Sequence, residues 1–268
     1  PDYAVTGVQT CALPISARTH RKSQRSTDGV TFLETIFERL RQAEGSAVLR
    51  EVRGEQIVSV SGREFLALIQ QARQFLAARG LKKGDRCVLL APNSIRWAAL
   101  DLAMMAEGIL VVPLYARQAP AELVAMMQDC APSRIFCSSA PLAAEINKLW
   151  TAAPKISILD GIFTGEDAPQ TPPCRHEPSD AVTIIYTSGT SGQAKGVVLT
   201  SGNFTHMLEC TGARLDQLMR GAKQPDRIFH YLPFCFAGSR VLLLSALSRR
   251  SVLTLSTDLT KLSEELKL

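Results

Sequence analysis

The chain lacks an apolar run long and clean enough to cross a membrane. Its most apolar stretch, 97–115, is interrupted by Asp101, Glu107 and Gly108, a pattern typical of a helix followed by a buried strand. The seven cysteines include no C-x-x-C pair and no His/Cys spacing suited to zinc. An odd cysteine count in a chain of this size favours reduced thiols and a cytoplasmic protein.

An excess of charge of one sign is also missing from most of the chain. The formal net charge is +5, but residues 1–26 carry four basic side chains against Asp2 and so account for +3 of it. The remaining +2 gives no support to nucleic-acid binding, which would rest only on residues 18–25. No basic amphipathic helix is evident either, so peripheral membrane attachment stays open without a segment to carry it.

We expect the first residues of the chain to have a different origin from the rest. VTGVQTCALPI (residues 5–15) resembles a translated sequencing adapter, so residues 1–16 are expected to be non-native. Residues 17–29 form an acid-poor basic leader. Its composition is superficially that of a transit peptide, and we expect it to be disordered.

From residue 30 onward, helical and strand-like segments alternate. The capping-box patterns Thr31-Phe-Leu-Glu34 and Ser61-Gly-Arg-Glu64 predict two helix starts. Apolar runs at 86–91, 109–115, 134–139, 181–188, 197–200, 227–233 and 252–256 predict strands separated by helices. This rhythm predicts an α/β fold with largely parallel sheets and helices on both faces.

The segment 161–180 interrupts this rhythm because it is rich in Pro, Gly and acidic residues. We therefore expect a first α/β subdomain over 30–160, a loop or linker over 161–180, and the start of a second α/β subdomain over 181–268. The last residues, from 259, predict a helix that the chain does not finish.

The segment YTSGTSGQAKGV (residues 186–197) combines three glycines, several hydroxyl groups and Lys195. Glycines let several backbone N–H groups converge on one anion, and a lysine supplies charge to phosphate oxygens. The Walker A spacing fails, because Lys195 is followed by glycine and the next residues are strand-like. We expect a strand–loop–strand phosphate clamp. A glycine-rich surface hairpin is the alternative.

This segment resembles the signature loop of the adenylate-forming (AMP-binding) superfamily, usually Tyr-Thr-Ser-Gly-Thr-Thr-Gly-x-Pro-Lys-Gly-Val. Ala194 stands where proline is usual. Residues 82–123 resemble an early family segment, and 230–247 resemble a block of the long-chain acyl-CoA synthetases. In that block Arg240 keeps the usual arginine, whereas Phe236 replaces the usual histidine. The resemblance covers about residues 30–268.

The resemblance implies an AMP-forming acyl-CoA synthetase, a ligase that uses ATP, Mg²⁺ and coenzyme A. A fatty acid carboxylate would attack the α-phosphate, and the acyl group would then pass to the thiol of coenzyme A. By position, Lys195 and Thr187 would serve adenylation, with Thr187 also helping to hold Mg²⁺. The β- and γ-phosphates would be bound by Thr187, Ser188, Gly189, Thr190, Ser191, Gly192 and Lys195. Phe234, Phe236 and Arg240 would belong to the substrate pocket.

Plainer interpretations remain for each residue. Lys195 would be a solvated loop lysine, Thr187 an ordinary strand residue, Arg240 a helix-surface charge, and Phe234 and Phe236 core aromatics. For the whole protein, the alternatives are a fatty acyl-AMP ligase or adenylation domain that loads a carrier protein, and a non-catalytic nucleotide-binding remnant. The family continues well beyond this length, with a further metal ligand and a C-terminal domain. We therefore expect the 268-residue chain alone to be inactive.

Overall fold

The computed structural model describes residues 31–165, 171–188, 194–219, 225–256 and 259–267. The proposed adapter segment 1–16 and leader 17–29 lie outside the described residues. So do residues 189–193 of the glycine loop.

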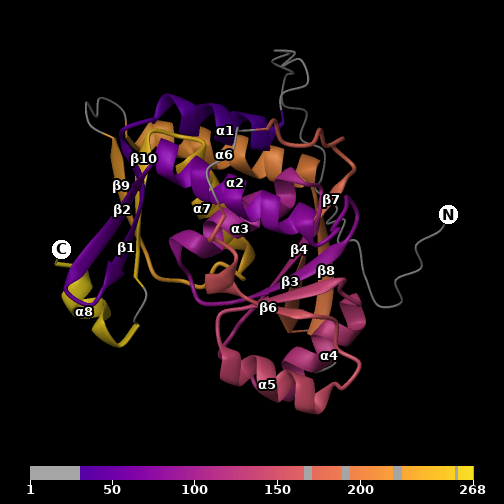
Figure 1. Cartoon of the computed structure of the whole chain (residues 1–268). Helices are drawn as coiled ribbons and strands as arrows, with labels where there is room; N and C mark the ends of the chain where they lie inside the picture. Colours follow the sequence, from indigo (N-terminus) through magenta and orange to yellow (C-terminus); the bar gives the residue numbers. More distant parts are fainter. Residues whose placement is uncertain (1–30, 166–170, 189–193, 220–224, 257–258, 268) are drawn as a thin grey trace.

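The larger of two sheets has six strands in the order β6-β5-β3-β4-β7-β8 (Figure 1). All neighbouring strands run parallel except β7 and β8, which pair antiparallel. The strands are β3 (Arg86–Leu90), β4 (Leu110–Leu114), β5 (Arg134–Cys137), β6 (Ile156–Ile158), β7 (Ala181–Ser188) and β8 (Ala194–Thr200).

The smaller sheet has four strands in the order β2-β1-β10-β9. Here β1 and β2 form an antiparallel hairpin, whereas β10 runs parallel to both β1 and β9. The strands are β1 (Ala47–Arg53), β2 (Gln56–Ser61), β9 (Asp226–His230) and β10 (Ser251–Leu255). The predicted α/β class with largely parallel sheets is confirmed.

The helices begin where local sequence favours it. Thr31 and Ser61 each accept a bond from the backbone of the glutamate three residues on, so both predicted capping boxes are present. Thr200 forms a third, with Asn203. The α-helices are α1 (Phe32–Gln42), α2 (Gly62–Ala78), α3 (Ile95–Ala106), α4 (Pro120–Cys130), α5 (Ala140–Leu149), α6 (Ser201–Leu218), α7 (Ala237–Leu247) and α8 (Leu262–Glu265).

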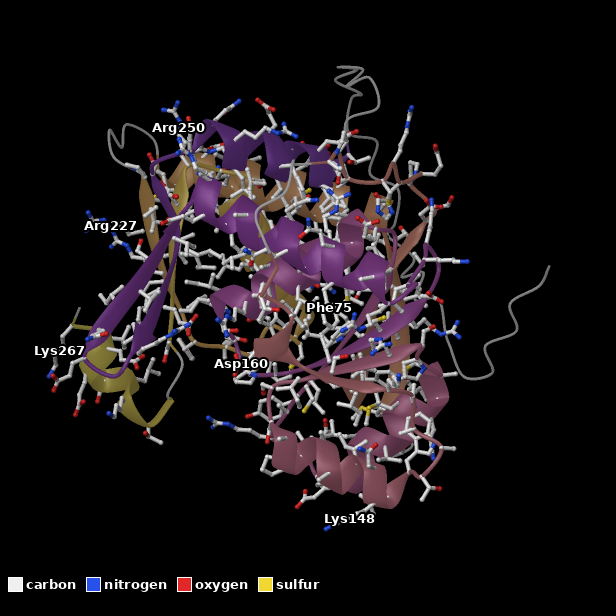
Figure 2. The ribbon with its side chains drawn as sticks, in the orientation of Figure 1. Phe75, Lys148, Asp160, Arg227, Arg250 and Lys267 are labelled. Carbon is white, nitrogen blue, oxygen red and sulfur yellow. The ribbon has the colours of Figure 1, made fainter. Side chains whose placement is uncertain are left out.

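Helices cover both faces of the six-stranded sheet (Figure 1). Along β3, Cys87 and Leu89 face the larger core, and Val88 and Leu90 face the smaller core under α4 and α5. This two-residue alternation places apolar side chains on both faces, as a parallel sheet covered on both sides requires. Figure 2 shows the charged side chains of Arg227, Arg250 and Lys267 at the periphery, with Lys148 projecting outward from α5.

The two sheets are interleaved along the chain. Each takes strands from before and after the loop 161–180, so this loop does not separate one sheet from the other. After the short 3-10 helix η1 (Leu159–Gly161), the described residues of the loop contain no helix or strand. Arg73 holds the loop by donating to the carbonyls of Thr171 and Pro172. Within the described part of the chain, no helix is both long and apolar enough to span a membrane.

Candidate active site

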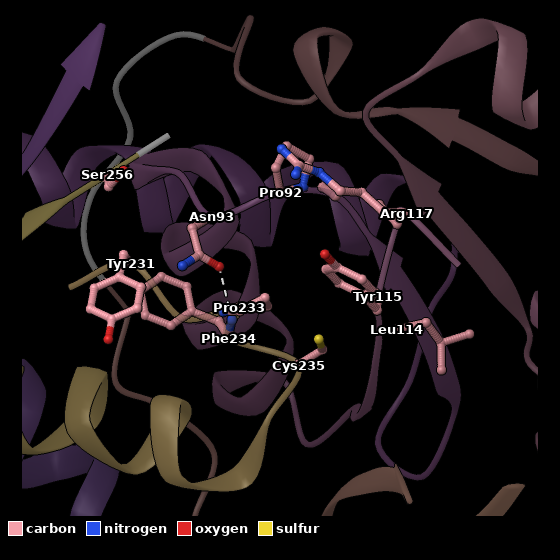
Figure 3. Close-up of a pocket in the computed structure, with 12 residues that line it drawn as sticks. Pro92, Asn93, Leu114, Tyr115, Arg117, Tyr231, Pro233, Phe234, Cys235 and Ser256 are labelled. Carbon is pink, nitrogen blue, oxygen red and sulfur yellow. Dashed lines mark hydrogen bonds between the residues drawn. The ribbon is translucent and has the colours of Figure 1, made fainter. Parts of the chain in front are cut away.

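A cavity lies at the carboxyl ends of strands from both sheets (Figure 3). In parallel sheets this edge is where ligands usually bind, because the connecting loops diverge there. The cavity volume is about 50 Å³, room for a few water molecules. It is lined by Ala91, Pro92, Asn93, Leu114, Tyr115, Ala116, Arg117, Tyr231, Pro233, Phe234, Cys235 and Ser256.

Asn93 holds two sides of the cavity together. Its Nδ2 donates to the carbonyl of Leu232 at 2.7 Å, and its Oδ1 accepts from the backbone N–H of Phe234 at 2.8 Å. Asn93 follows β3 of the larger sheet, whereas Leu232 and Phe234 follow β9 of the smaller sheet. The buried amide therefore fixes the carboxyl ends of the two sheets relative to each other.

The two predicted pocket phenylalanines occupy different environments. Phe234 is fully buried, its ring stacked on His230 at 5.3 Å and 5.1 Å from Trp97, and it forms one cavity wall. Phe236 is 50% exposed and does not line the cavity. Its ring centroid lies 6.1 Å from that of Tyr115, a residue that lines the cavity. Phe234 is therefore both a core residue and a cavity wall.

Two groups beside the cavity carry shifted pKa values. Burial raises the pKa of the Cys235 thiol to about 11, so it is protonated near neutral pH and a poor nucleophile. Burial lowers the pKa of His230. Ser239 Oγ donates its one proton to the Leu232 carbonyl and lies 2.5 Å from His230 Nε2. The serine oxygen must therefore accept from His230, so Nε2 carries the proton of the neutral imidazole. Neither residue is arranged as a nucleophile and base.

The glycine loop joins two paired strands at this same edge. Thr187 lies opposite Lys195, and Ser188 opposite Ala194, in the antiparallel pair of β7 and β8. Because β7 runs parallel to β4, with Val111 paired to Thr183, the end of β7 lies on the edge that carries the cavity. The predicted strands on both sides of the loop are confirmed. Gly189, Thr190, Ser191 and Gly192 lie outside the described residues.

The base of this hairpin is closely packed. A Cβ on Gly196 would lie 2.8 Å from Ile184 Cγ2 and 3.2 Å from Tyr186 Cζ, so only glycine fits without displacement. The Tyr186 hydroxyl donates to the Asp129 carboxylate of α4 at 2.5 Å. Burial, with that carboxylate alongside, raises the pKa of Tyr186. Thr187, the next residue, is exposed, and the Lys195 side chain is half-buried.

Arg240 is a core residue of α7 with polar partners. It is fully buried, and it is not among the residues that line the cavity. Its Nε and Nη2 donate to the two carboxylate oxygens of Asp101 at 3.0 and 2.6 Å, and Nη1 donates to Thr183 Oγ1. The burial of Arg240 shows that the surface-charge alternative is wrong, whereas its assignment to the substrate pocket stays a prediction.

The hairpin offers few ligands of its own for Mg²⁺. Thr187 places one exposed hydroxyl at the end of β7. Among the described residues, no group of three or more His, Cys, Asp or Glu side chains could hold a metal ion. Mg²⁺ commonly binds through one or two protein oxygens together with substrate phosphates and water. The exposed Thr187 hydroxyl is compatible with this mode of binding.

Comparison with known proteins identifies the family. Residues 37–267 match the family described as "AMP-binding enzyme". The chain belongs to this family. Solved adenylate-forming enzymes share the fold. One is o-succinylbenzoate CoA synthetase (MenE) from Bacillus subtilis in complex with an acyl-adenylate intermediate. It aligns with a TM-score of 0.71 at 19% identity, and the alignment covers 87% of this chain and 58% of that one. Fatty acyl-adenylate ligase from L. pneumophila aligns at 0.71 and 16% identity, over 88% and 41%.

Curated relatives include CoA ligases. Long-chain-fatty-acid–CoA ligase FadD13 of Mycobacterium tuberculosis is 30% identical over 192 residues, or 68% of this chain and 37% of that protein. FadD15 of Mycobacterium bovis is 26% identical over 210 residues, or 72% of this chain and 34% of that protein. The chain therefore spans about a third of the length of these AMP-binding relatives and matches their N-terminal body.

Sequence reasoning missed several residues of this site. Asn93, Tyr115 and Cys235 line the cavity but were not selected from the sequence. A usable signal was present for Asn93, a polar residue directly after the buried strand that ends at Leu90. No local signal marks Asp101 as the partner of Arg240, because the two are 139 residues apart.

Proposed function

We propose that the protein containing this chain activates a fatty acid with ATP, releasing pyrophosphate, and transfers the acyl group to coenzyme A. The observation that carries the proposal is a juxtaposition: the hairpin with Thr187 and Lys195 opens on the same sheet edge as the cavity. Such an arrangement brings a polyphosphate and a second substrate together, and adenylation consists mainly of that positioning and of charge neutralisation.

Each group in the hairpin has a role under this proposal. Backbone N–H groups and hydroxyls of Ser188, Gly189, Thr190, Ser191 and Gly192 would bind the β- and γ-phosphates, and Lys195 would neutralise them. Mg²⁺ bound to the nucleotide would withdraw charge from the phosphate oxygens, with Thr187 supplying one oxygen ligand. Together these residues would hold and orient the nucleotide, while the carboxylate of the second substrate would be the nucleophile.

Two observations favour a fatty acid as the carboxylate. Large apolar side chains, those of Tyr231, Leu232 and Phe236, are 42%, 48% and 50% exposed beside the cavity, which suits an apolar substrate better than an amino acid. FadD13 and FadD15, moreover, are long-chain-fatty-acid–CoA ligases. We expect a cytoplasmic enzyme that meets its substrate at a membrane surface.

A carrier protein is the alternative acyl acceptor. The fold likeness to fatty acyl-adenylate ligase from L. pneumophila favours this second candidate. Both candidates share the first half-reaction, so they differ only in which thiol takes the acyl group.

The test is fatty-acid-dependent exchange of labelled pyrophosphate into ATP. It should be run on this chain extended by the C-terminal portion that its relatives carry, and on the 268-residue chain. We expect exchange in the extended protein, abolished by Lys195→Ala, and none in the 268-residue chain. Thiol consumption with coenzyme A or a phosphopantetheinyl carrier then identifies the acceptor. Lack of exchange with every carboxylate tried on the extended protein would refute the proposal.

A further inference from the structure

The buried guanidinium of Arg240 connects four elements. Arg240 lies in the first turn of α7, its two contacts to Asp101 reach α3, and its contact to Thr183 reaches β7. Thr183 Oγ1 in turn donates to the Val111 carbonyl of β4 at 2.6 Å. These contacts form one continuous chain of hydrogen bonds with no solvent exposure, since Arg240, Asp101 and Thr183 are each 0% exposed.

Stability alone does not explain such a pair. Removing two charges from water costs several kcal/mol, and hydrophobic residues of similar volume are often as stable or more so in the place of a buried ion pair. An aliphatic side chain at 240 could fill the same space. An aliphatic side chain could not donate a hydrogen bond to Thr183. Asp101 accepts from Nε and Nη2 of the guanidinium, which leaves Nη1 to donate to Thr183 Oγ1.

Thr183 lies where β7 pairs with β4 in the larger sheet. It is the residue of β7 that pairs with Val111 of β4, and Thr187 lies four residues further along the same strand. The last two described pairs of the hairpin are Thr187 with Lys195 and Ser188 with Ala194. Any shift of β7 along β4 would therefore be passed directly to Thr187 and Lys195.

Arg240 is also tied to the cavity. Its backbone N–H donates to the Phe236 carbonyl, and α7 begins directly after the cavity-wall residues Pro233, Phe234 and Cys235. Asn93 holds that wall from the other side. Arg240 thus joins α7, which begins just after the cavity wall, to β7, the strand that leads into the hairpin.

We propose that Arg240 is a positioning residue that sets the base of the β7–β8 hairpin relative to the cavity wall. It acts through Thr183 and touches no substrate. The inference rests on the proposed function for its consequence, because the distance it fixes would be that between the bound polyphosphate and the acyl substrate. Misplacement on the order of 1 Å can cost about a hundredfold in rate.

The experiment separates positioning from stability by removing the charges in pairs. The double variant Arg240→Met with Asp101→Leu leaves no unpaired buried charge. Thr183→Val removes only the hydroxyl that Arg240 contacts. Arg73→Met with Glu107→Leu is the matched control: Arg73 is also buried and paired with a carboxylate, but it contacts the loop 161–180 and not β7.

Two readouts are compared on the 268-residue chain: hydrogen exchange at the amides of Thr187, Lys195 and Gly196, and affinity for tripolyphosphate. We expect the Arg240 double variant to keep the urea midpoint of the wild type, and Thr183→Val to lower it, because Arg240 Nη1 and the Val111 carbonyl lose a buried partner. Both should exchange these amides about tenfold faster, since local opening reports local packing, and bind tripolyphosphate several-fold more weakly. The Arg73 control should change neither readout.

Arg240→Lys with Asp101 retained extends the test. Lysine keeps the charge but lacks the planar fork that reaches both partners, so we expect it to behave like Thr183→Val. If exchange at the hairpin base is unchanged in the double variant and in Thr183→Val, the positioning role is refuted. If the wild-type chain does not bind tripolyphosphate, the proposed function is weakened, while the exchange rates still decide the role of Arg240.

Discussion

Thr187 and Lys195 lie opposite each other at the open end of the β7–β8 hairpin. The pairing brings an exposed hydroxyl and a half-buried ammonium to the two ends of the glycine loop, next to the edge that carries the cavity. A polyphosphate held there would meet both groups together.

Lys195→Ala is expected to weaken the binding of tripolyphosphate to the 268-residue chain about tenfold, near 1.4 kcal/mol, because a charge-assisted hydrogen bond is lost. Titration calorimetry at two salt concentrations measures it. Lys148→Ala is the control, because Lys148 is an exposed lysine on α5 that projects away from the sheet (Figure 2). Equal losses in the two variants would mean that the anion is held by net charge and not by the hairpin.

Gly196→Ala is expected to destabilise the fold by about 1–3 kcal/mol, because the added methyl would overlap Ile184 and Tyr186 at the hairpin base. Urea unfolding measures the change. Gly212→Ala is the matched control: Gly212 lies within α6 with nothing within 4 Å of an added Cβ. There the substitution should stabilise by roughly 0.5–1 kcal/mol, since alanine favours a helix interior. A harmless Gly196→Ala would show that β7 and β8 are less closely packed than described.

Among the described cysteines, Cys210 is the exposed one and should react first with iodoacetamide. Cys235 should react slowly at pH 8, with a rate that rises about tenfold per pH unit until its thiol ionises near pH 11. Cys87 and Cys130, whose pKa values burial raises to about 12, should react only on unfolding. Peptide mass spectrometry after timed labelling gives the order. Rapid labelling of Cys235 at pH 8 would contradict the burial of the cavity wall.

Acid should destabilise the protein through His230. Burial lowers its pKa in the folded state below the ordinary value of 6.5, so below about pH 6.5 the unfolded chain binds a proton that the folded chain does not. The free energy of unfolding should therefore fall as the pH drops from 7 towards the folded pKa. His230→Gln should flatten this slope, whereas His206→Gln, at an exposed position of α6, should leave it unchanged. Parallel slopes for wild type and His230→Gln would refute the assignment.

Local features of the fold could be predicted because their causes are local. The capping boxes at Thr31 and Ser61 contain both partners within four residues, and the strands on either side of the glycine loop follow from β-branched runs. The β1–β2 hairpin was missed, although Gly54, with φ of 61°, marks its turn. None of the residues of its outer strand, β2, is fully buried.

Of the candidate site, sequence reasoning selected the loop motif and Phe234 of the cavity wall. Asp101 is the only acidic residue of α3, and Arg240 is the only charged residue of α7. Their pairing depends on how α3 and α7 pack, which no local pattern specifies. The cavity likewise is built from four strand ends that meet only in the folded chain.

The interleaved sheets set an order of events during synthesis. Leu49 of β1 is the register partner of Leu253 of β10, so the four-stranded sheet cannot close until the ribosome has passed β10. At roughly 5–20 residues per second, the β1–β2 hairpin waits on the order of ten seconds or more with an unpaired edge. The edge of β1 that β10 will cover is therefore exposed while β7, β8 and the hairpin between them are still being synthesised.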